Sequence, residues 1–154
     1  MSGTGLSRPP GESPGKESES TYRLDGQIGH VLRRAHQRHI ALFTRQIGDL
    51  TPQQFAALAK LREVGRTSQN QLGSLIAMDA ATVKGVIDRL RARGYVELRR
   101  NEEDRRRLMV DLTETGRQAV ETLLPLAQQV SDETLSPLSS SEAALLLKLL
   151  SKLA

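Results

Sequence analysis

Residues 95–116 read YVELRRNEEDRRRLMVDLTETG, in which two short alternating segments flank a charged tip. Alternation with a period of two on both sides of a polar tip predicts a β-hairpin with one buried face. The tip, residues 101–107, is too polar to pack against apolar groups, and arginines at such a tip suit a narrow, negatively charged groove. The side chains expected on the buried face are Val96, Leu98, Leu108, Val110 and Leu112.

Two short helices joined by a tight turn are predicted just before this hairpin, over residues 69–77 and 80–93. Ser68 and Asp79 are the expected N-caps, and Gly94 ends the second helix. This is the helix-turn-helix arrangement, whose second helix reads bases with its N-terminal end. An ordinary helical hairpin is the alternative, but the β-hairpin that follows favours a winged helix. The core-facing residues of the second helix are expected to be Val83, Val86, Ile87 and Leu90.

Longer helices are predicted on either side of this unit. A helical pattern covers residues 22–48, and Thr51 with Gln54 forms a capping box for a helix that ends at Gly65. After the hairpin, a helix runs from Thr113 to about residue 134, where Pro125 is expected to produce a kink or a local break.

A final helix is predicted after residue 139, capped by Ser139 with Glu142. It is apolar nearly all round between Leu145 and Leu150. Such a helix needs cover on most sides, and a second chain is one source of that cover.

Composition favours helices and excludes several classes of protein. With 154 residues we expect one domain, and 3% aromatic residues without Trp leave aliphatic side chains to build the core. The absence of Cys excludes disulfides, Cys-ligated zinc, iron–sulfur clusters and thiol-based redox sensing. No apolar run approaches a membrane span or a signal peptide, so a cytoplasmic location is expected. Residues 1–20, rich in Gly, Pro, Ser and Glu, are expected to be a disordered tail.

Positive charge is concentrated in one window. The chain carries a net charge of +4, and residues 84–107 alone hold nine Lys or Arg against five Asp or Glu. A basic patch is the electrostatic footprint of a protein that binds a phosphate backbone. A solvated helix face is the alternative, so charge alone leaves the partner open.

The ordered set of segments resembles the MarR family of bacterial transcriptional regulators, from roughly residue 24 to the C-terminus. The likeness is strongest over residues 50–116, where Asp104 and Arg106 match the family's D-x-R. The resemblance implies a fold that is mainly α with a small β-hairpin wing. It places a winged helix over about 50–112 and dimerisation helices over about 22–48 and 113–154. The trailing V-x-L-T-x-x-G of the family is matched by Val110, Leu112, Thr113 and Gly116.

The resemblance also implies a homodimeric, sequence-specific DNA-binding repressor. Two lobes would occupy successive major grooves of a pseudo-palindromic site in double-stranded DNA, with half-sites about 10 bp apart. A small molecule bound between the dimerisation helices and the DNA-binding lobe would release the operator. An aromatic acid or its thioester is the expected effector.

The family's pattern assigns roles within the wing. Arg106 is the candidate for insertion into the minor groove, and Asp104 is expected to orient it by a salt bridge. Arg105 and Arg107 are expected either to contact phosphate or to remain solvated.

In the reading helix, Ala81, Thr82 and Lys84 are the candidates for the major groove. Small residues there let the backbone approach the bases. The candidate phosphate partners are Arg89, Arg91, Arg99 and Arg100, and for Arg89 the alternative is a role in tying down the wing.

The first long helix offers candidates for an effector site. Arg33, His36 and His39 lie on it, and Phe55 of the next helix is a candidate pocket wall. Polar residues on an apolar helix face suit a carboxylate ligand that enters between helices. The alternatives are a buried His with a backbone partner, an interchain contact, or, for Phe55, plain core. No third ligand accompanies the two histidines, so neither a metal nor a cofactor is expected.

Two other functions compete with a DNA-binding regulator. A winged-helix module that binds a protein or RNA partner, without its own operator, is the first. An enzyme is the second, but the chain shows no nucleophile with a matched base, no phosphate-cradling glycine loop and no metal-ligand cluster. We therefore expect a regulator and not an enzyme.

Overall fold

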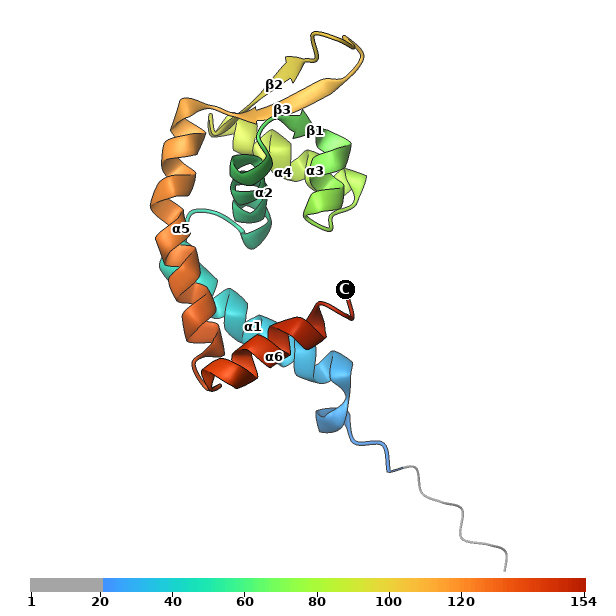
Figure 1. Ribbon diagram of the computed structural model, residues 1–154, viewed down its shortest axis with the longest axis vertical. Helices are drawn as coiled ribbons and strands as arrows, with labels where there is room; N and C mark the ends of the chain where they lie inside the picture. Colours follow the sequence, from blue (N-terminus) through green and yellow to red (C-terminus); the bar gives the residue numbers. More distant parts are fainter. Residues whose placement is uncertain (1–20) are drawn as a thin grey trace, which may run out of the picture.

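The computed structural model describes residues 21–154, so the tail predicted over residues 1–20 lies outside the described part (Figure 1). Helices α2, α3 and α4 and the sheet form one lobe, while α1, α6 and the far half of α5 form the opposite end. We call residues 52–112 the winged-helix lobe. In chain order the elements are η1 (Leu24–Gly26, a 3-10 turn), α1 (Ile28–Ile47), α2 (Pro52–Val64), β1 (Thr67–Ser68), α3 (Gln69–Leu75), α4 (Ala80–Ala92), β2 (Val96–Arg100), β3 (Leu108–Leu112), α5 (Glu114–Leu135) and α6 (Ser140–Leu150).

The predicted hairpin is confirmed as strands β2 and β3 of an antiparallel sheet with the order β1-β3-β2. Val96 lies opposite Leu112, and both side chains are buried. Leu108 contradicts the prediction of a buried face, because it is 50% exposed. Leu108 pairs with Arg100 at the end of the hairpin next to the tip, and it lines an open groove beside α3, so it is only half covered.

The third strand, β1, was not predicted. Thr67 pairs with Val110, and Ser68 pairs with Met109. Ser68 is also the N-cap of α3, as expected, because its Oγ accepts a hydrogen bond from the Gln71 N–H at 3.2 Å. Two residues are too few to show alternation, so the pattern could not reveal this strand.

The reading helix packs as predicted. All four residues expected to face the core are buried, and α2, α3 and β2 supply their neighbours. The predicted capping boxes of Thr51 with Gln54 and of Ser139 with Glu142 are both complete. Gly94 follows α4 with a φ of 73°, a left-handed conformation that favours glycine. The buried residues of α4 are Val83, Val86, Ile87 and Leu90.

Helix α5 links the lobe to the other end of the molecule. It continues without a break through Pro125 and its axis bends partway along, so of the predicted kink or local break the break does not occur (Figure 1). The missing N–H of Pro125 removes one hydrogen bond, which bends a helix without ending it when the flanking turns are packed. Near its far end, Glu133 accepts from Arg45 Nη2 at 2.5 Å and from Gln46 Nε2 at 2.8 Å, which fixes α5 to α1.

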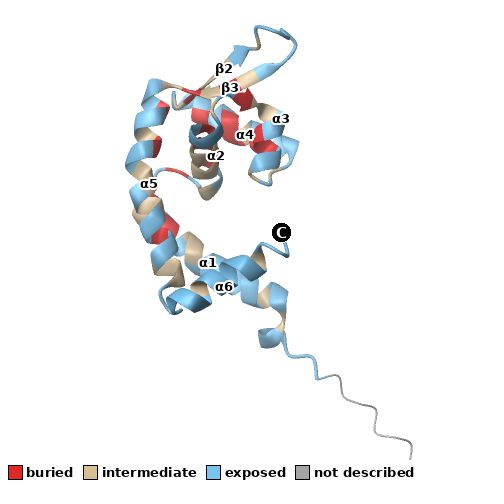
Figure 2. Ribbon diagram, in the orientation of Figure 1, coloured by how far each residue is buried: buried red, intermediate tan, exposed pale blue. Residues whose placement is uncertain are grey.

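A large apolar surface stays uncovered at the α1–α6 end. None of the residues of α6 is buried, and in Figure 2 the helix is mostly pale blue, the colour of exposed residues. The N-terminal half of α1 is similarly exposed. A chain of this size rarely leaves so many large apolar residues together in water, so the surface is built to be covered. The exposed residues are Leu24, Ile28, Val31, Leu32, Leu138, Leu145, Leu146, Leu147, Leu149 and Leu153.

Candidate nucleic-acid interface

The N-terminal turn of α4 is exposed and polar, although its side chains are held within the helix. Asp79 Oδ2 accepts from Thr82 Oγ1 at 3.0 Å, and Asp79 Oδ1 accepts from the Thr82 N–H at 2.7 Å. These hydrogen bonds lower the pKa of the Asp79 carboxyl. Lys84 Nζ lies 2.7 Å from Asp88 Oδ2. Ala81 beside them is exposed, so the turn offers a small backbone profile with a hydroxyl and an ammonium at its surface.

The wing tip is organised by Asp104. Its Oδ1 accepts from the backbone N–H of Arg106 at 3.1 Å, and its Oδ2 lies 3.6 Å from Arg107 Nε. The salt bridge expected between Asp104 and Arg106 is therefore made with Arg107. Asp104 holds Arg106 through the backbone instead, which leaves the Arg106 guanidinium free to reach outward, and Arg105 is exposed next to it.

The other predicted arginines lie in different places. Arg89 extends back over Gly85 on α4 and lines a shallow pocket with Thr51, so it does not tie down the wing. Arg91 is exposed. Arg99 lies on the wing, where its Nη2 is 2.6 Å from Glu97 Oε1.

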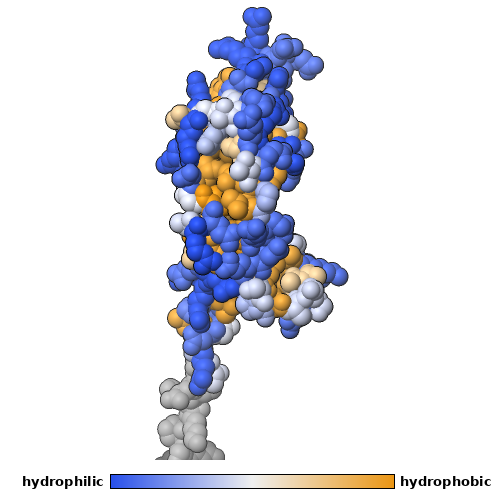
Figure 3. Space-filling model, turned by 90° about the vertical axis from the view of Figure 1, so that its left-hand side faces the viewer, coloured by the Kyte–Doolittle hydropathy of each residue, from blue (hydrophilic) through white to orange (hydrophobic). Residues whose placement is uncertain are grey.

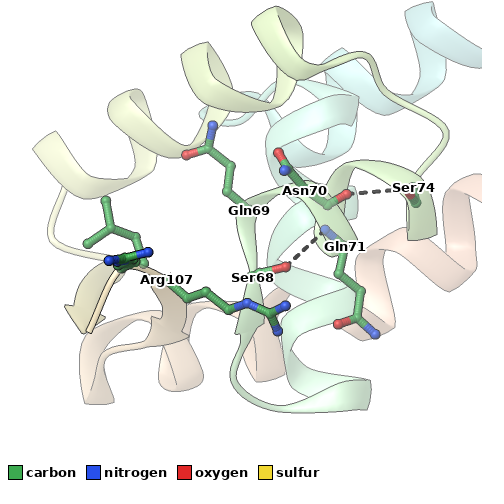
Figure 4. A pocket seen from close by; sticks show the side chains of 8 residues that line it. Ser68, Gln69, Asn70, Gln71, Ser74 and Arg107 are labelled. Atoms are coloured by element: carbon green, nitrogen blue, oxygen red, sulfur yellow. Dashed lines mark hydrogen bonds between the residues drawn. The ribbon is translucent and has the colours of Figure 1, made fainter. Parts of the chain in front are cut away.

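Helix α3 contributes polar residues that sequence reasoning missed. A groove of about 600 Å³ runs between α3 and the wing. Figure 4 shows Arg107 extending toward Ser68 and Gln71 at the start of α3. In the sequence, the only sign of this surface is the run of amide side chains over residues 69–71. Without the position of the wing, this run predicts no more than an ordinary exposed turn. The polar residues that line the groove are Ser68, Gln69, Asn70, Gln71, Ser74, Arg106 and Arg107.

The base of the wing is fixed by a three-membered ion-pair cluster. Asp111 of β3 has a side chain only 15% exposed, and it lies 3.3 Å from both Arg66 Nε and Arg117 Nη2. Arg66 precedes β1, and Arg117 lies in the first turns of α5. The cluster therefore links the wing to the elements on both sides of it.

A second candidate site lies beside α1. A cleft of about 640 Å³ is bounded by α1, the α1–α2 loop, the start of α2 and Met78. His36 lines this cleft together with Ile40 and Thr44, which lie one and two turns further along the same face of α1. Arg33 lies one turn before His36 and is exposed, but it does not line the cleft.

The other effector candidates have clear structural contacts. His39 Nδ1 lies 3.0 Å from Thr134 Oγ1, and burial, followed by the neighbouring charge of His36, lowers the pKa of His39 below 6.5. Phe55 packs edge-on against Phe43, with ring centroids 6.0 Å apart. His36 and His39 both line a further, apolar pocket of about 380 Å³ between α1, α5 and α6.

Two further properties concern the described residues, 21–154. No helix there has both the length and the apolar character needed to cross a membrane. Within the same range, His, Asp and Glu side chains do not gather in threes at a spacing that would hold a metal ion.

A helix-turn-helix whose second helix exposes its N-terminal turn, next to an arginine-tipped wing, defines a winged-helix DNA-binding protein. A family model described as MarR family matches residues 50–108. The HTH-type transcriptional repressor NicR of Pseudomonas putida is 40% identical over 134 residues, which span 86% of this chain and 85% of NicR. The chain belongs to the MarR family and is a DNA-binding transcriptional regulator, not an enzyme.

Solved structures agree with this assignment. A probable transcriptional regulator from Pseudomonas aeruginosa is 49% identical and superposes with a TM-score of 0.82, over 86% of this chain and 100% of that one. Bordetella bronchiseptica BpsR, whose DNA binding is described as regulated by 6-hydroxynicotinic acid, is 40% identical. Its TM-score is 0.84, over 87% of this chain and 97% of BpsR.

Proposed function

We propose that this protein is a homodimeric repressor that binds a pseudo-palindromic operator and leaves it when a small aromatic carboxylate binds. The observation that carries the proposal is the placement of two exposed DNA-reading elements on one lobe. The α4 N-terminal turn and the wing tip both belong to the winged-helix lobe, while the uncovered apolar surface lies at the opposite end (Figures 1 and 2).

On the DNA, the two elements have different tasks. Thr82 and Lys84, beside Ala81, face the base edges of a major groove, where the hydroxyl and ammonium replace their intrahelical partners with bases. Arg106 enters the adjacent minor groove, whose negative potential attracts a guanidinium. Phosphate contacts from Arg89, Arg91, Arg99, Arg105 and Arg107 fix the register without reading sequence.

The test is operator binding by Arg106→Ala, measured by gel shift over a range of salt concentrations on the DNA upstream of the protein's own gene. Affinity should fall, and the slope of log K against log salt should decrease by about one, since about 0.9 counterions are released per phosphate contact. Arg62→Ala is the matched control, because Arg62 pairs with Glu121 on α5, away from α4 and the wing. An unchanged slope in folded R106A would remove Arg106 from the interface.

The same assay separates a regulator from a winged-helix module that binds a protein or RNA. Sequence-specific binding in the nanomolar range supports an operator. Binding that weakens with salt but does not depend on sequence would favour the alternative, because phosphate contacts alone produce that behaviour.

The dimer is proposed from the uncovered leucines. Obligate homodimer interfaces resemble a protein core cut in half, and the α1–α6 surface has that character. Residues of about 22–48 and 113–154 would then interleave with those of the partner, leaving one winged-helix lobe on each side.

The effector is proposed to occupy the His36 cleft, which lies between α1 and the winged-helix lobe. BpsR's printed ligand, 6-hydroxynicotinic acid, is an aromatic carboxylate of a size that a cleft of about 640 Å³ accommodates. His36 would meet the carboxylate, with Arg33 adding positive charge one turn away. His39 and Phe55 do not line this cleft, since His39 contacts Thr134 and Phe55 packs against Phe43.

Thermal-shift titration tests the effector proposal. We expect 6-hydroxynicotinic acid to raise the melting temperature of the wild-type protein and to weaken operator binding. The matched control ligand is 2-hydroxypyridine, which lacks the carboxylate, and the matched variant is His36→Ala. If a panel of aromatic acids neither stabilises the protein nor weakens its operator binding, no effector of this class binds.

A further inference from the structure

The end of the reading helix is tied directly to the start of α5. After α4, Gly94 adopts a positive φ, and the Tyr95 N–H donates to the Leu90 carbonyl at 3.0 Å, as in a Schellman motif. The Tyr95 carbonyl then accepts the Thr113 N–H at 3.1 Å. A short chain of backbone hydrogen bonds therefore joins the C-terminus of α4 to the start of α5.

Arg93 connects the same point to the end of α1. Its Nη1 donates a hydrogen bond to the backbone carbonyl of Asp49, in the α1–α2 loop. Its Nη2 lies 3.5 Å from Tyr95 Oη, and its Cζ lies 5.1 Å from the centre of the Tyr95 ring. A planar guanidinium can stack on an aromatic face and donate sideways at the same time. Arg93 thus clamps the α1–α2 loop onto the end of α4.

The loop that Arg93 holds has an unusual backbone. Gly48 has φ 52° and ψ −59°, and the Asp49 N–H donates to the Ile47 carbonyl at 2.5 Å. This is a γ-turn with positive φ, a rare and strained conformation. Strained turns persist only where the surrounding structure holds them, and a contact from Arg93 lies at the next residue.

The same loop separates two hollows. On one side is the His36 cleft, and on the other is a pocket of about 360 Å³ between the loop and α5. The face of the molecule that carries α5 is apolar at mid-height (Figure 3). On the α1 side of this junction, Arg93 makes the directed contact, while Ile47, Leu50 and Leu123 add apolar packing, which fixes an angle less tightly than a directed hydrogen bond does. On the α5 side, Arg62 of α2 also pairs with Glu121.

We propose that Arg93 is a positioning residue for operator binding, which fixes the angle of the winged-helix lobe on the dimerisation helices at the Gly48 turn. The inference rests on the proposed homodimer, because this angle sets the separation of the two α4 helices. With the angle fixed, both helices enter successive major grooves without further ordering. If the angle is free, binding of the second α4 helix must first order its lobe, which costs conformational entropy. The increase in affinity that comes from binding two half-sites is then smaller.

The experiment compares a whole operator with half of one. The operator is the duplex that the wild-type protein selects from a random-sequence library, and the second duplex has one half-site scrambled. For Arg93→Ala we expect unchanged affinity for the half-site duplex, while the ratio of full-site to half-site affinity falls by roughly tenfold or more. Arg93→Lys should give an intermediate ratio, because an ammonium can still donate to the Asp49 carbonyl but cannot also bridge to Tyr95.

The controls separate positioning from charge and from folding. Lys60→Ala removes a positive charge that pairs with Glu63 on α2, and it should leave the ratio unchanged. The half-site affinity reports whether α4 and the wing are folded. If Arg93→Ala lowers that affinity, the ratio of full-site to half-site affinity is taken from Arg93→Lys instead. A wild-type ratio in both Arg93 variants would overturn the positioning role alone. A wild-type protein that gains nothing from the second half-site would overturn the homodimeric operator, and the positioning role with it.

Discussion

Replacing Gly116 with Ala tests how tightly α5 is docked on the winged-helix lobe. A Cβ at this position would lie 1.9 Å from the carbonyl oxygen of Tyr95 and 2.8 Å from its carbonyl carbon. Both atoms belong to the backbone, so no side chain can rotate away to make room. The first turn of α5 and the start of β2 must therefore move apart.

The loss of stability follows from the hydrogen bonds that this movement breaks. The Thr113 N–H donates to Tyr95 O at 3.1 Å, and Thr113 Oγ1 donates to Gly94 O at 2.5 Å. Each lost hydrogen bond costs about 1 kcal/mol, and overpacking a close-packed site costs about 1–3 kcal/mol. We expect Gly116→Ala to lower the free energy of unfolding by roughly 3–5 kcal/mol, the sum of these terms.

Urea denaturation followed by circular dichroism measures the change, at one fixed protein concentration because a dimer's stability depends on concentration. Gly85→Ala is the control within a helix. Its Cβ would meet nothing closer than Arg89 Nη1 at 3.9 Å, so helix propensity alone should stabilise it by up to about 1 kcal/mol. A loss in Gly116→Ala no larger than the ~0.5 kcal/mol of an ordinary surface substitution would refute the close docking.

Two further predictions concern the dimer and pH. Leu149→Glu should convert the proposed dimer to a monomer, as measured by light scattering. Ser151→Glu, which adds the same charge two residues further on, should leave the dimer intact. If the Leu149→Glu variant stays dimeric, the interface lies elsewhere. Because the pKa of His39 is lowered in the folded protein, the unfolded chain binds a proton at this residue more readily than the folded chain does. The free energy of unfolding should therefore fall as the pH drops from about 6.5 to the lower pKa of the folded state. His39→Gln should flatten this part of the stability curve, and an equally steep curve in the variant would assign it to another group.

The features that could be predicted are those that depend on local chemistry. The hairpin followed from period-two alternation, and the start of every helix after α1 followed from a cap such as Thr51, Ser68 or Asp79. These signals lie within a few residues of the structure that they specify, so no distant contact is needed to interpret them. Helix α1 begins at Ile28, later than the predicted residue 22, and Gln27 before it makes no capping hydrogen bond with its side chain.

The features that could not be predicted depend on contacts distant in sequence. β1 exists only because β3, about forty residues later, offers it a partner, and Leu108 is half exposed because it faces an open groove beside α3 and not the core. The sequence leaves the role of His39 open between a ligand and a structural partner, because the residue it contacts, Thr134, lies nearly a hundred residues further along the chain. In the sequence, Arg93 is only one residue of a basic window, because its contact with Asp49 depends on the path of the α1–α2 loop.

The two residues of β1 limit how this protein can change its target. Thr67 extends the sheet beneath the wing, and Ser68 both pairs with β3 and begins α3. An inserted or deleted residue here would shift the wing and α3 together, and α4 with them. Changes of DNA sequence preference should therefore occur through side chains of α4 and through the sequence and length of the tip at residues 101–107. The strands and helices that hold α4 and the tip in place should stay constant.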